Sequence, residues 1–249
     1  MIVAKRKPID EIKEMLKPYQ KILVLGCGSC VAVCMAGGEK EAGMLTTELQ
    51  MTFELDKTLP PSGGTEFTPP LAGPGSAKQI DTITILRQCD REYIEEVKDK
   101  LVQYDTILSL ACGVGVQFTA EVLAGEKVLL PGVNTTFLGA TIELGTWMER
   151  CLACGDCILD ETGGVCPVTM CSKSLMNGPC GGHEKGKCEV DRNRDCGWVL
   201  IYERLKKLGK LDLMNKINPP KNYGAVKRPD KIIHEAYQTP QITQTKEAK

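Results

Sequence analysis

The sequence predicts an open α/β domain built on a parallel sheet, followed by a cysteine-rich domain of a different kind. Up to about residue 138, short apolar runs rich in β-branched residues alternate with helical patterns, as they do in parallel α/β sheets. Between Cys151 and Cys196 this periodicity is lost, and glycine, proline and cysteine dominate. We therefore expect an α/β domain at residues 1–138, a cysteine-rich domain at 139–208 and a basic tail at 209–249.

Each element of the first domain follows from a local pattern. Residues 7–19 carry apolar side chains at helical spacing, and Pro18 ends the pattern. The apolar run KILVLG at 21–26 is typical of a buried strand. The later patterns predict a helix at 27–54 with a break at Gly37-Gly38, a Pro/Gly-rich loop at 59–78, strands at 81–89, 105–112 and 127–133, and helices at 91–103, 114–124 and, in the second domain, 197–208.

Hydropathy and charge limit the class of protein. No stretch approaches the roughly 18 uninterrupted apolar residues of a membrane span, and the charged N-terminal stretch has no apolar segment behind it, so we expect a soluble, cytoplasmic protein. From residue 183 onward, 15 Lys and Arg stand against 9 Asp and Glu. Because these basic residues are not clustered with aromatic ones, they favour a partner protein over nucleic acid. A tail that is merely solvated is the alternative.

The cysteines of the second domain indicate metal ligation. Thirteen cysteines in a reducing compartment favour metals over disulfides. The second domain begins its cysteine run with C-x2-C-x2-C spacing and later has Cys166-Pro167, a combination with which bacterial ferredoxins hold 4Fe-4S clusters. We therefore expect a ferredoxin-like iron–sulfur domain with two 4Fe-4S clusters, whose ligands are Cys151, Cys154, Cys157, Cys166, Cys171, Cys180, Cys188 and Cys196.

The grouping of these ligands stays open. Cys151, Cys154 and Cys157 are expected to bind one cluster, with a fourth ligand from Cys166 or Cys196. The other cluster would take the remaining cysteines, because two-cluster ferredoxins exchange their fourth ligands between motifs. The alternative is a zinc ribbon with two structural zinc ions, which usually pairs C-x2-C knuckles; only the first three cysteines here have that spacing.

A second group of cysteines is predicted in the first domain. Cys27, Cys89 and Cys112 each stand at or just beyond the end of a predicted strand, and the carboxyl ends of parallel strands share one edge, where ligands bind. Cys30 and Cys34 lie on a helix that leaves the same edge. These five thiols could hold a third 4Fe-4S cluster or zinc, or they could be ordinary buried cysteines. A dinucleotide site is disfavoured, because GCGSC lacks the third glycine of G-x-G-x-x-G.

No catalytic residues are predicted. The chain has 2 histidines, and no Ser/His/Asp or paired-carboxylate arrangement can be defended. Three hypotheses remain: an electron-transfer subunit, a zinc-held scaffold that stabilises or regulates a reductase, and an enzyme that transfers a methyl group to a zinc-activated thiol.

Several motifs resemble those of one known family. GCGSCVAVCMAGGEKE, RQCDRE, ACGVGVQ, CLACGDCILDETGGVCPVTMCSKSLMNGPCGG and CEVDRNRDCGW together resemble the small iron–sulfur subunit of methylenetetrahydrofolate reductase from anaerobic bacteria. The second half also resembles the domain described as a methylenetetrahydrofolate reductase C-terminal domain. The likeness covers nearly the whole chain and is weak at 59–78 and in the tail.

The resemblance implies partners and a role. It implies a flavin-bearing large subunit on which methylenetetrahydrofolate is reduced to methyltetrahydrofolate. It also implies that the small subunit carries electrons between that flavin and an outside donor, such as ferredoxin or another redox protein. Some members of the family are described as containing zinc, so the metal at the first-domain cysteines stays open.

Overall fold

A four-stranded parallel sheet forms the centre of the first part of the chain. The computed structural model describes residues 1–58, 78–226 and 228–233, and the chain divides into two units, Met1–Cys151 and Leu152–Lys249. In the first unit the strand order is β3-β2-β4-β5, and every neighbouring pair is parallel. These strands are β2 (Lys21–Cys27), β3 (Gln79–Ile85), β4 (Thr106–Ser109) and β5 (Val128–Pro131). The predicted parallel α/β sheet is thus confirmed.

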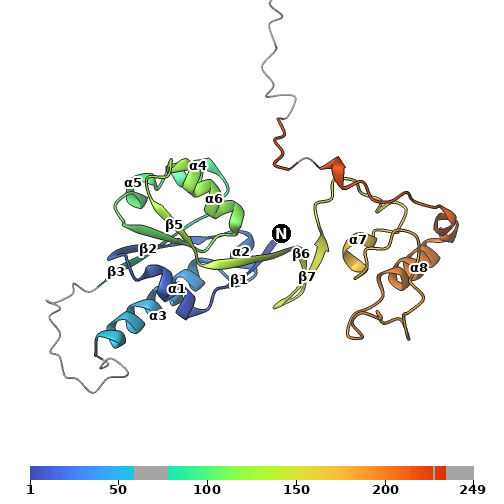
Figure 1. Ribbon diagram of the computed structural model, residues 1–249, viewed down its shortest axis with the longest axis horizontal. Coiled ribbons are helices and arrows are strands. Elements are labelled where there is room, and N and C mark those ends of the chain that lie inside the picture. The colour runs from blue at the N-terminus through green and yellow to red at the C-terminus, as the bar shows by residue number, and fades with distance from the viewer. Residues whose placement is uncertain (59–77, 227, 234–249) are drawn as a thin grey trace, which may run out of the picture. The chain divides into compact units, whose positions relative to one another are not determined.

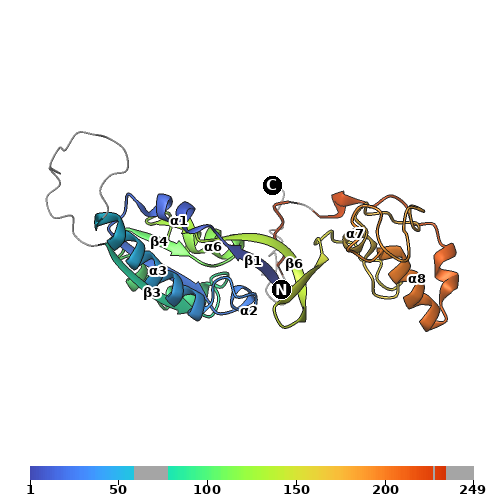
Figure 2. The same ribbon diagram turned by 90° about the horizontal axis from the view of Figure 1, so that it is seen from below.

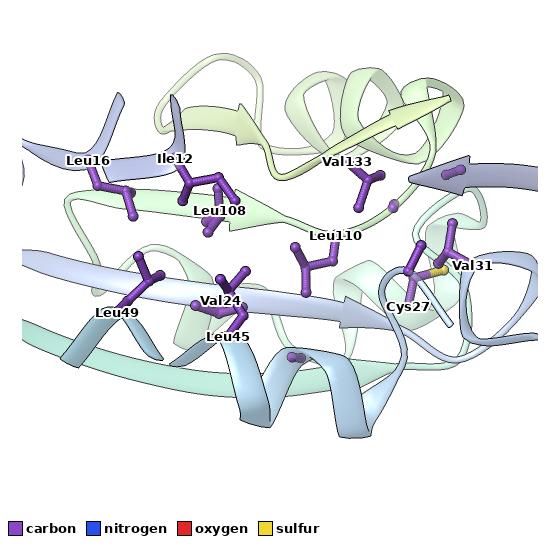
Figure 3. Packing of buried hydrophobic residues seen from close by; sticks show 14 of the residues in the cluster. Ile12, Leu16, Val24, Cys27, Val31, Leu45, Leu49, Leu108, Leu110 and Val133 are labelled. Carbon is purple, nitrogen blue, oxygen red and sulfur yellow. The ribbon is translucent and has the colours of Figure 1, made fainter. Parts of the chain in front are cut away.

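Helices cover both faces of this sheet (Figure 1). One face packs against α1 (Ile9–Leu16) and α3 (Glu39–Thr58), through a core that includes Val24, Leu45 and Leu108. Figure 3 shows Val24 and Leu108 from the strands beside Leu45 and Leu49 from α3. The other face, which presents Leu23, Leu25 and Ile107, packs against α4 (Arg91–Glu95), α5 (Lys98–Leu101) and α6 (Gly113–Val122).

The helices are shorter than the patterns predicted in two places. The predicted helix at 27–54 is divided into α2 (Cys30–Val33) and α3, with Gly37 and Gly38 between them. A Cβ on Gly37 would overlap with the Leu110 carbonyl, so the chain must turn there with a glycine. The predicted helix at 91–103 is likewise divided into α4 and α5. The predicted loop at 59–78 falls, except for Lys78, outside the described residues.

A second, antiparallel sheet was not expected from the sequence. It has the order β1-β6-β7 and consists of β1 (Ile2–Arg6), β6 (Val133–Glu143) and β7 (Thr146–Cys151). β1 pairs along β6 (Figure 2), and a tight turn at Gly145, with φ of 80°, joins β6 to β7. β6 also passes through residue 138, where the sequence placed the end of the first domain.

The second unit has little regular structure. Its helices are α7 (Pro167–Met170) and α8 (Gly197–Leu208), followed by the 3-10 turns η1 (Leu211–Asn215) and η2 (Tyr223–Ala225). Within the described residues of this unit, β-pairing is limited to isolated bridges such as Glu184 with Lys187, so a ferredoxin-like sheet is not shown. Its buried core consists of Cys196, Trp198, Ile201 and Leu205. The predicted helix at 197–208 is confirmed.

The chain after Gly209 departs from expectation. The polar, proline-bearing sequence after Gly209 predicted a tail that is extended along a partner or partly disordered. In the structure, Leu213 and Met214 of η1 pack against the core of the second unit. Residues 234–249, including His234, lie outside the described part of the chain. Among the described residues, no helix has the length and apolar character needed to cross a membrane.

Candidate metal-binding cysteines

A pocket opens at the carboxyl edge of the parallel sheet. The chain leaves β2 through α3 on one face of the sheet and leaves β4 through α6 on the other. The order β3-β2-β4-β5 therefore has its switch point between β2 and β4, which is where open α/β sheets bind ligands. The cavity there has a volume of about 140 Å³, and four of its lining residues are Cys27, Cys30, Cys89 and Cys112.

The thiols of this pocket influence one another. Cys89 as a whole is exposed, but neighbouring atoms desolvate its sulfur, and this raises the pKa of the thiol above its ordinary value. Nearby negative charge on Cys27 and Cys112 raises the pKa of Cys89 further. Repulsion between thiolates is relieved when a cation binds among them, because a metal ion reverses the local electrostatics.

Gln88 fixes the loop that carries Cys89. Its side chain is fully buried, and its amide nitrogen donates to the Leu25 carbonyl at 2.8 Å and to the Gly26 carbonyl at 3.1 Å. The Ser109 hydroxyl donates to the amide oxygen at 2.6 Å. Gln88 thus connects the loop after β3 to the ends of both β2 and β4. Only its position beside Cys89 could have drawn attention to it in the sequence, because a single glutamine leaves no periodic pattern.

Cys34 does not line this pocket with the other four. It is buried in the core, where the backbone N–H of Ala4 donates to its sulfur at 3.4 Å. Its sulfur also lies 3.6 Å from the Val31 carbonyl. The Cys34 thiol therefore connects β1 to the turn after α2. A strand at the N-terminus was not predicted, so this environment could not be foreseen.

The loop with C-x2-C-x2-C spacing, which begins at the last residue of the first unit, Cys151, is sharply bent. Ala153 and Gly155 have φ of 50° and 82°, in the left-handed region that favours glycine. Cys154 is partly buried, whereas Cys151 and Cys157 are exposed. A left-handed residue in each of the two gaps lets a short chain turn back on itself, as it must if three sulfurs are to face one small ligand.

Cys171 and Cys196 belong to one small apolar core. Cys166 and Cys171 stand at the two ends of α7, and Cys196 immediately precedes α8. The two helices meet at Gly197, where an added Cβ would lie 2.6 Å from the Met170 carbonyl oxygen and 3.0 Å from the Cys171 nitrogen. Only a glycine permits this approach, which brings the backbone beside Cys196 against that of Cys171.

Cys188 and Cys180 lie in polar surroundings near the same place. The Cys188 sulfur is 3.6 Å from the Ser172 hydroxyl oxygen. That hydroxyl and the backbone N–H of Val190 lower the pKa of Cys188 by hydrogen bonding to its thiolate. Cys180 lies 3.5 Å from the Glu189 carboxylate, which is paired with Lys173. A thiolate that already accepts hydrogen bonds is in the form that metals bind.

The donor chemistry of both groups fits a thiophilic metal. All thirteen cysteines fall in the described parts of the chain, and all are free thiols. In the conformation described, however, no three His, Cys, Asp or Glu side chains of those residues are grouped so that they could hold a metal ion. Clusters and zinc both bind thiolates, so the side chains fit either group, and the sulfurs would have to converge further on binding.

Fold and site together define an α/β protein with thiols at the edge of its sheet and a second unit poor in apolar core and rich in cysteine. A family model described as methylene-tetrahydrofolate reductase C terminal matches residues 130–224. This segment contains all eight cysteines from Cys151 to Cys196. Over these residues the chain is similar to the C-terminal domain of methylenetetrahydrofolate reductases. No curated protein and no solved structure gives a significant match to the chain.

Proposed function

We propose that the chain is an electron-transfer subunit of a methylenetetrahydrofolate reductase complex, located in the cytoplasm. The observation that carries the proposal is the segment 130–224, which matches the reductase C-terminal family and holds eight free thiols, while the apolar cluster of its second-unit part has four buried residues. Such a core is too small to stabilise a unit of this length, so a bound group must contribute to its folding. Two 4Fe-4S clusters would use all eight thiols.

The arrangement of the second unit supports one grouping of ligands. Cys171 and Cys196 share a core, and Cys188 lies beside Ser172, the neighbour of Cys171. We assign these three, with Cys180, to one cluster. The other cluster then takes Cys151, Cys154, Cys157 and Cys166. When bound, such clusters accept and donate single electrons.

The proposed partners follow from this role. A flavin-bearing large subunit would carry out the reduction of methylenetetrahydrofolate, because no catalytic residues are assigned to this chain. Ferredoxin or another redox protein would supply the electrons. The thiols of the first unit would hold a third 4Fe-4S cluster or zinc. Desolvation is the main cause of the raised pKa of Cys89, and negative charge on Cys27 and Cys112 adds to it; a bound cation would relieve that repulsion.

Metal analysis of the full chain tests the proposal. Protein purified without oxygen should be brown, absorb broadly near ~400 nm with bleaching on reduction, and contain about eight iron atoms, or about twelve if the first unit binds a cluster as well. Cys154→Ser should remove about four of them. Cys89→Ser is the comparison variant for the first unit: it should leave the about eight iron atoms of the second group in place and lower the iron content only if the first unit binds a cluster. Colourless protein with tightly bound zinc and no iron would contradict the proposal and favour a zinc-held structural or regulatory subunit.

Activity of the reconstituted complex provides a second test. With Cys154→Ser in place, transfer from ferredoxin to methylenetetrahydrofolate should stop, while chemically reduced flavin in the large subunit should still react. If ferredoxin-driven activity survives this change, the cluster that Cys154 holds does not lie on the electron path.

A further inference from the structure

The last described residues of the chain contact the loop with C-x2-C-x2-C spacing. That loop has two gaps between its cysteines, one with Ala153 and the other with Gly155 and Asp156. The side chains of Lys221, Val226 and Arg228 touch these gaps. No local pattern connects these segments, and Lys221 is 65 residues from its partner Asp156 in the chain.

Lys221 makes the most buried of these contacts. Its side chain is only 5% exposed, which is uncommon for lysine unless the ammonium is paired. The ammonium donates to the backbone carbonyl of Asp156 and lies 3.4 Å from the carboxylate of the same residue. Lys221 therefore holds the second gap of the loop both by hydrogen bonding and by charge.

Val226 and Arg228 complete the contact. A Cβ on Gly155 would overlap with the Val226 side chain, so Val226 lies directly against the glycine between Cys154 and Cys157. Arg228 donates from its guanidinium to the Ala153 carbonyl at 3.2 Å. The Ala153 carbonyl lies in the first gap, and the Asp156 carbonyl, which accepts from Lys221, lies in the second. Side chains of the C-terminal segment therefore hold both bends of the loop.

Two upstream contacts fix the start of this segment. The side chain of Asn177 exchanges two hydrogen bonds with the backbone of Asn218, at 2.7 and 2.8 Å. Lys216 pairs with Glu161, whose side chain is 18% exposed. The segment thus reaches Lys221 already attached to the second unit, which lowers the entropy lost when it closes over the loop.

We propose that Lys221, Val226 and Arg228 form a strap that holds both bends of the C-x2-C-x2-C loop, from which its three sulfurs can converge on a metal group. In this proposal, which rests on the proposed function, Lys221 and Arg228 are positioning residues and touch no metal. They act on the loop through Asp156 and Ala153. Their positive charge also favours the reduced form of the group, because each electron received from the one-electron donor adds one negative charge beside them.

Single substitutions in the full chain test the strap. Lys221→Met should leave the Asp156 carboxylate without its partner, and Arg228→Met should release the first gap. Both variants should show several-fold faster amide hydrogen exchange at residues 152–157 and several-fold faster loss of iron to a chelator. One midpoint potential should shift to a more negative value in a redox titration followed by electron paramagnetic resonance. Lys221→Arg should restore exchange and iron retention.

Lys231→Met is the matched control, because it removes an exposed lysine of the same segment beyond the contacts. If exchange, iron loss and potential in Lys221→Met and Arg228→Met all equal those of Lys231→Met, the strap is refuted. A wild-type chain that binds no iron would contradict the proposed function instead. In that case hydrogen exchange at 152–157 still decides about the strap, since it reports on the loop whether or not metal is present.

Discussion

At the scale of single residues, the pocket of the first unit depends on one buried amide. Gln88 is the residue through which the loop with Cys89 is bonded to β2 and to Ser109 of β4. Buried carbonyls need such donors, because a polar group that is removed from water and left unpaired destabilises the fold. Gln88 thus contributes to the stability of the sheet and to the position of a candidate ligand.

Gln88→Met should lower the free energy of unfolding by about 2 kcal/mol, because it removes the donors of two buried carbonyls while keeping a similar side-chain volume. Chemical denaturation of the full chain measures the change. Gln103→Met is the control, since the Gln103 amide makes a single exposed bond to the Asp99 carbonyl; it should change stability by no more than about 0.5 kcal/mol. Equal effects of the two substitutions would show that the buried amide has no special role.

At the scale of elements, α7 and α8 depend on a close backbone contact. Gly197→Ala places a Cβ 2.6 Å from the Met170 carbonyl oxygen. Because this neighbour is backbone, the clash can be relieved only if α7 or α8 shifts. The variant should destabilise the second unit by about 1–3 kcal/mol, as measured by hydrogen exchange in α8.

The same substitution at another glycine separates this steric effect from helix propensity. In Gly43→Ala, the new Cβ meets no atom of the described residues within 4 Å apart from those of its own helix. It should stabilise α3 by up to about 1 kcal/mol. A destabilisation at Gly43 similar to that at Gly197 would contradict the account of the α7–α8 contact.

Another element-scale prediction concerns pH and the start of β2. The Asp105 carboxylate accepts from the backbone N–H groups of Lys21 at 2.8 Å and Gln20 at 3.0 Å, and these bonds lower its pKa. Because the pKa of Asp105 is lower in the folded than in the unfolded chain, its ionised form stabilises the fold at pH values above the unfolded-state pKa of about 3.9. This stabilisation is lost as the pH falls through the folded-state pKa. Asp105→Asn should therefore reduce the loss of stability on acidification below about pH 4, as measured by urea unfolding at several pH values. If the variant loses as much unfolding free energy below about pH 4 as the wild type does, this role of Asp105 is contradicted.

At the scale of the whole molecule, the two units are stabilised in different ways. The first unit has two apolar clusters, one on each face of its sheet. The second has one cluster of four buried residues and is held in part by contacts of its C-terminal segment, such as those of Lys221 and Asn218. The stability of the second unit should therefore depend on a bound group far more than that of the first.

Removal of metal tests this difference. Treating the anaerobically purified chain with an iron chelator should increase hydrogen exchange throughout residues 152–226, while β2 and β4 keep their protection, because apolar clusters on both faces stabilise the sheet. Hydrogen exchange measured by mass spectrometry distinguishes the two regions. Full protection of α8 in metal-free protein would show that its four-residue core is sufficient.

The sequence determined the elements whose signal is local. Apolar runs such as KILVLG predicted β2 and the parallel sheet, because a strand that is buried on both faces is a continuous apolar run. The amphipathic pattern of 197–208 predicted α8, because a helix that buries one face has apolar residues at helical spacing. Cys27 ends β2, as the local pattern predicted, whereas β3 and β4 end four residues before Cys89 and three residues before Cys112. The antiparallel sheet did not, because the pairing of β1 with β6 joins segments separated by most of the first unit and neither has a pattern of its own.

Only the tertiary structure shows which side chains and backbone groups surround each cysteine and which contacts hold the loops that carry them. It placed Cys34 in the core beside Ala4 and set Gln88 behind Cys89. It also laid Lys221 and Arg228 across the loop that contains Cys154. These contacts join residues that are far apart in the chain, and their free energy depends on burial and geometry that no local pattern records. The sequence thus determined the number and spacing of the thiols, and the fold determined their surroundings.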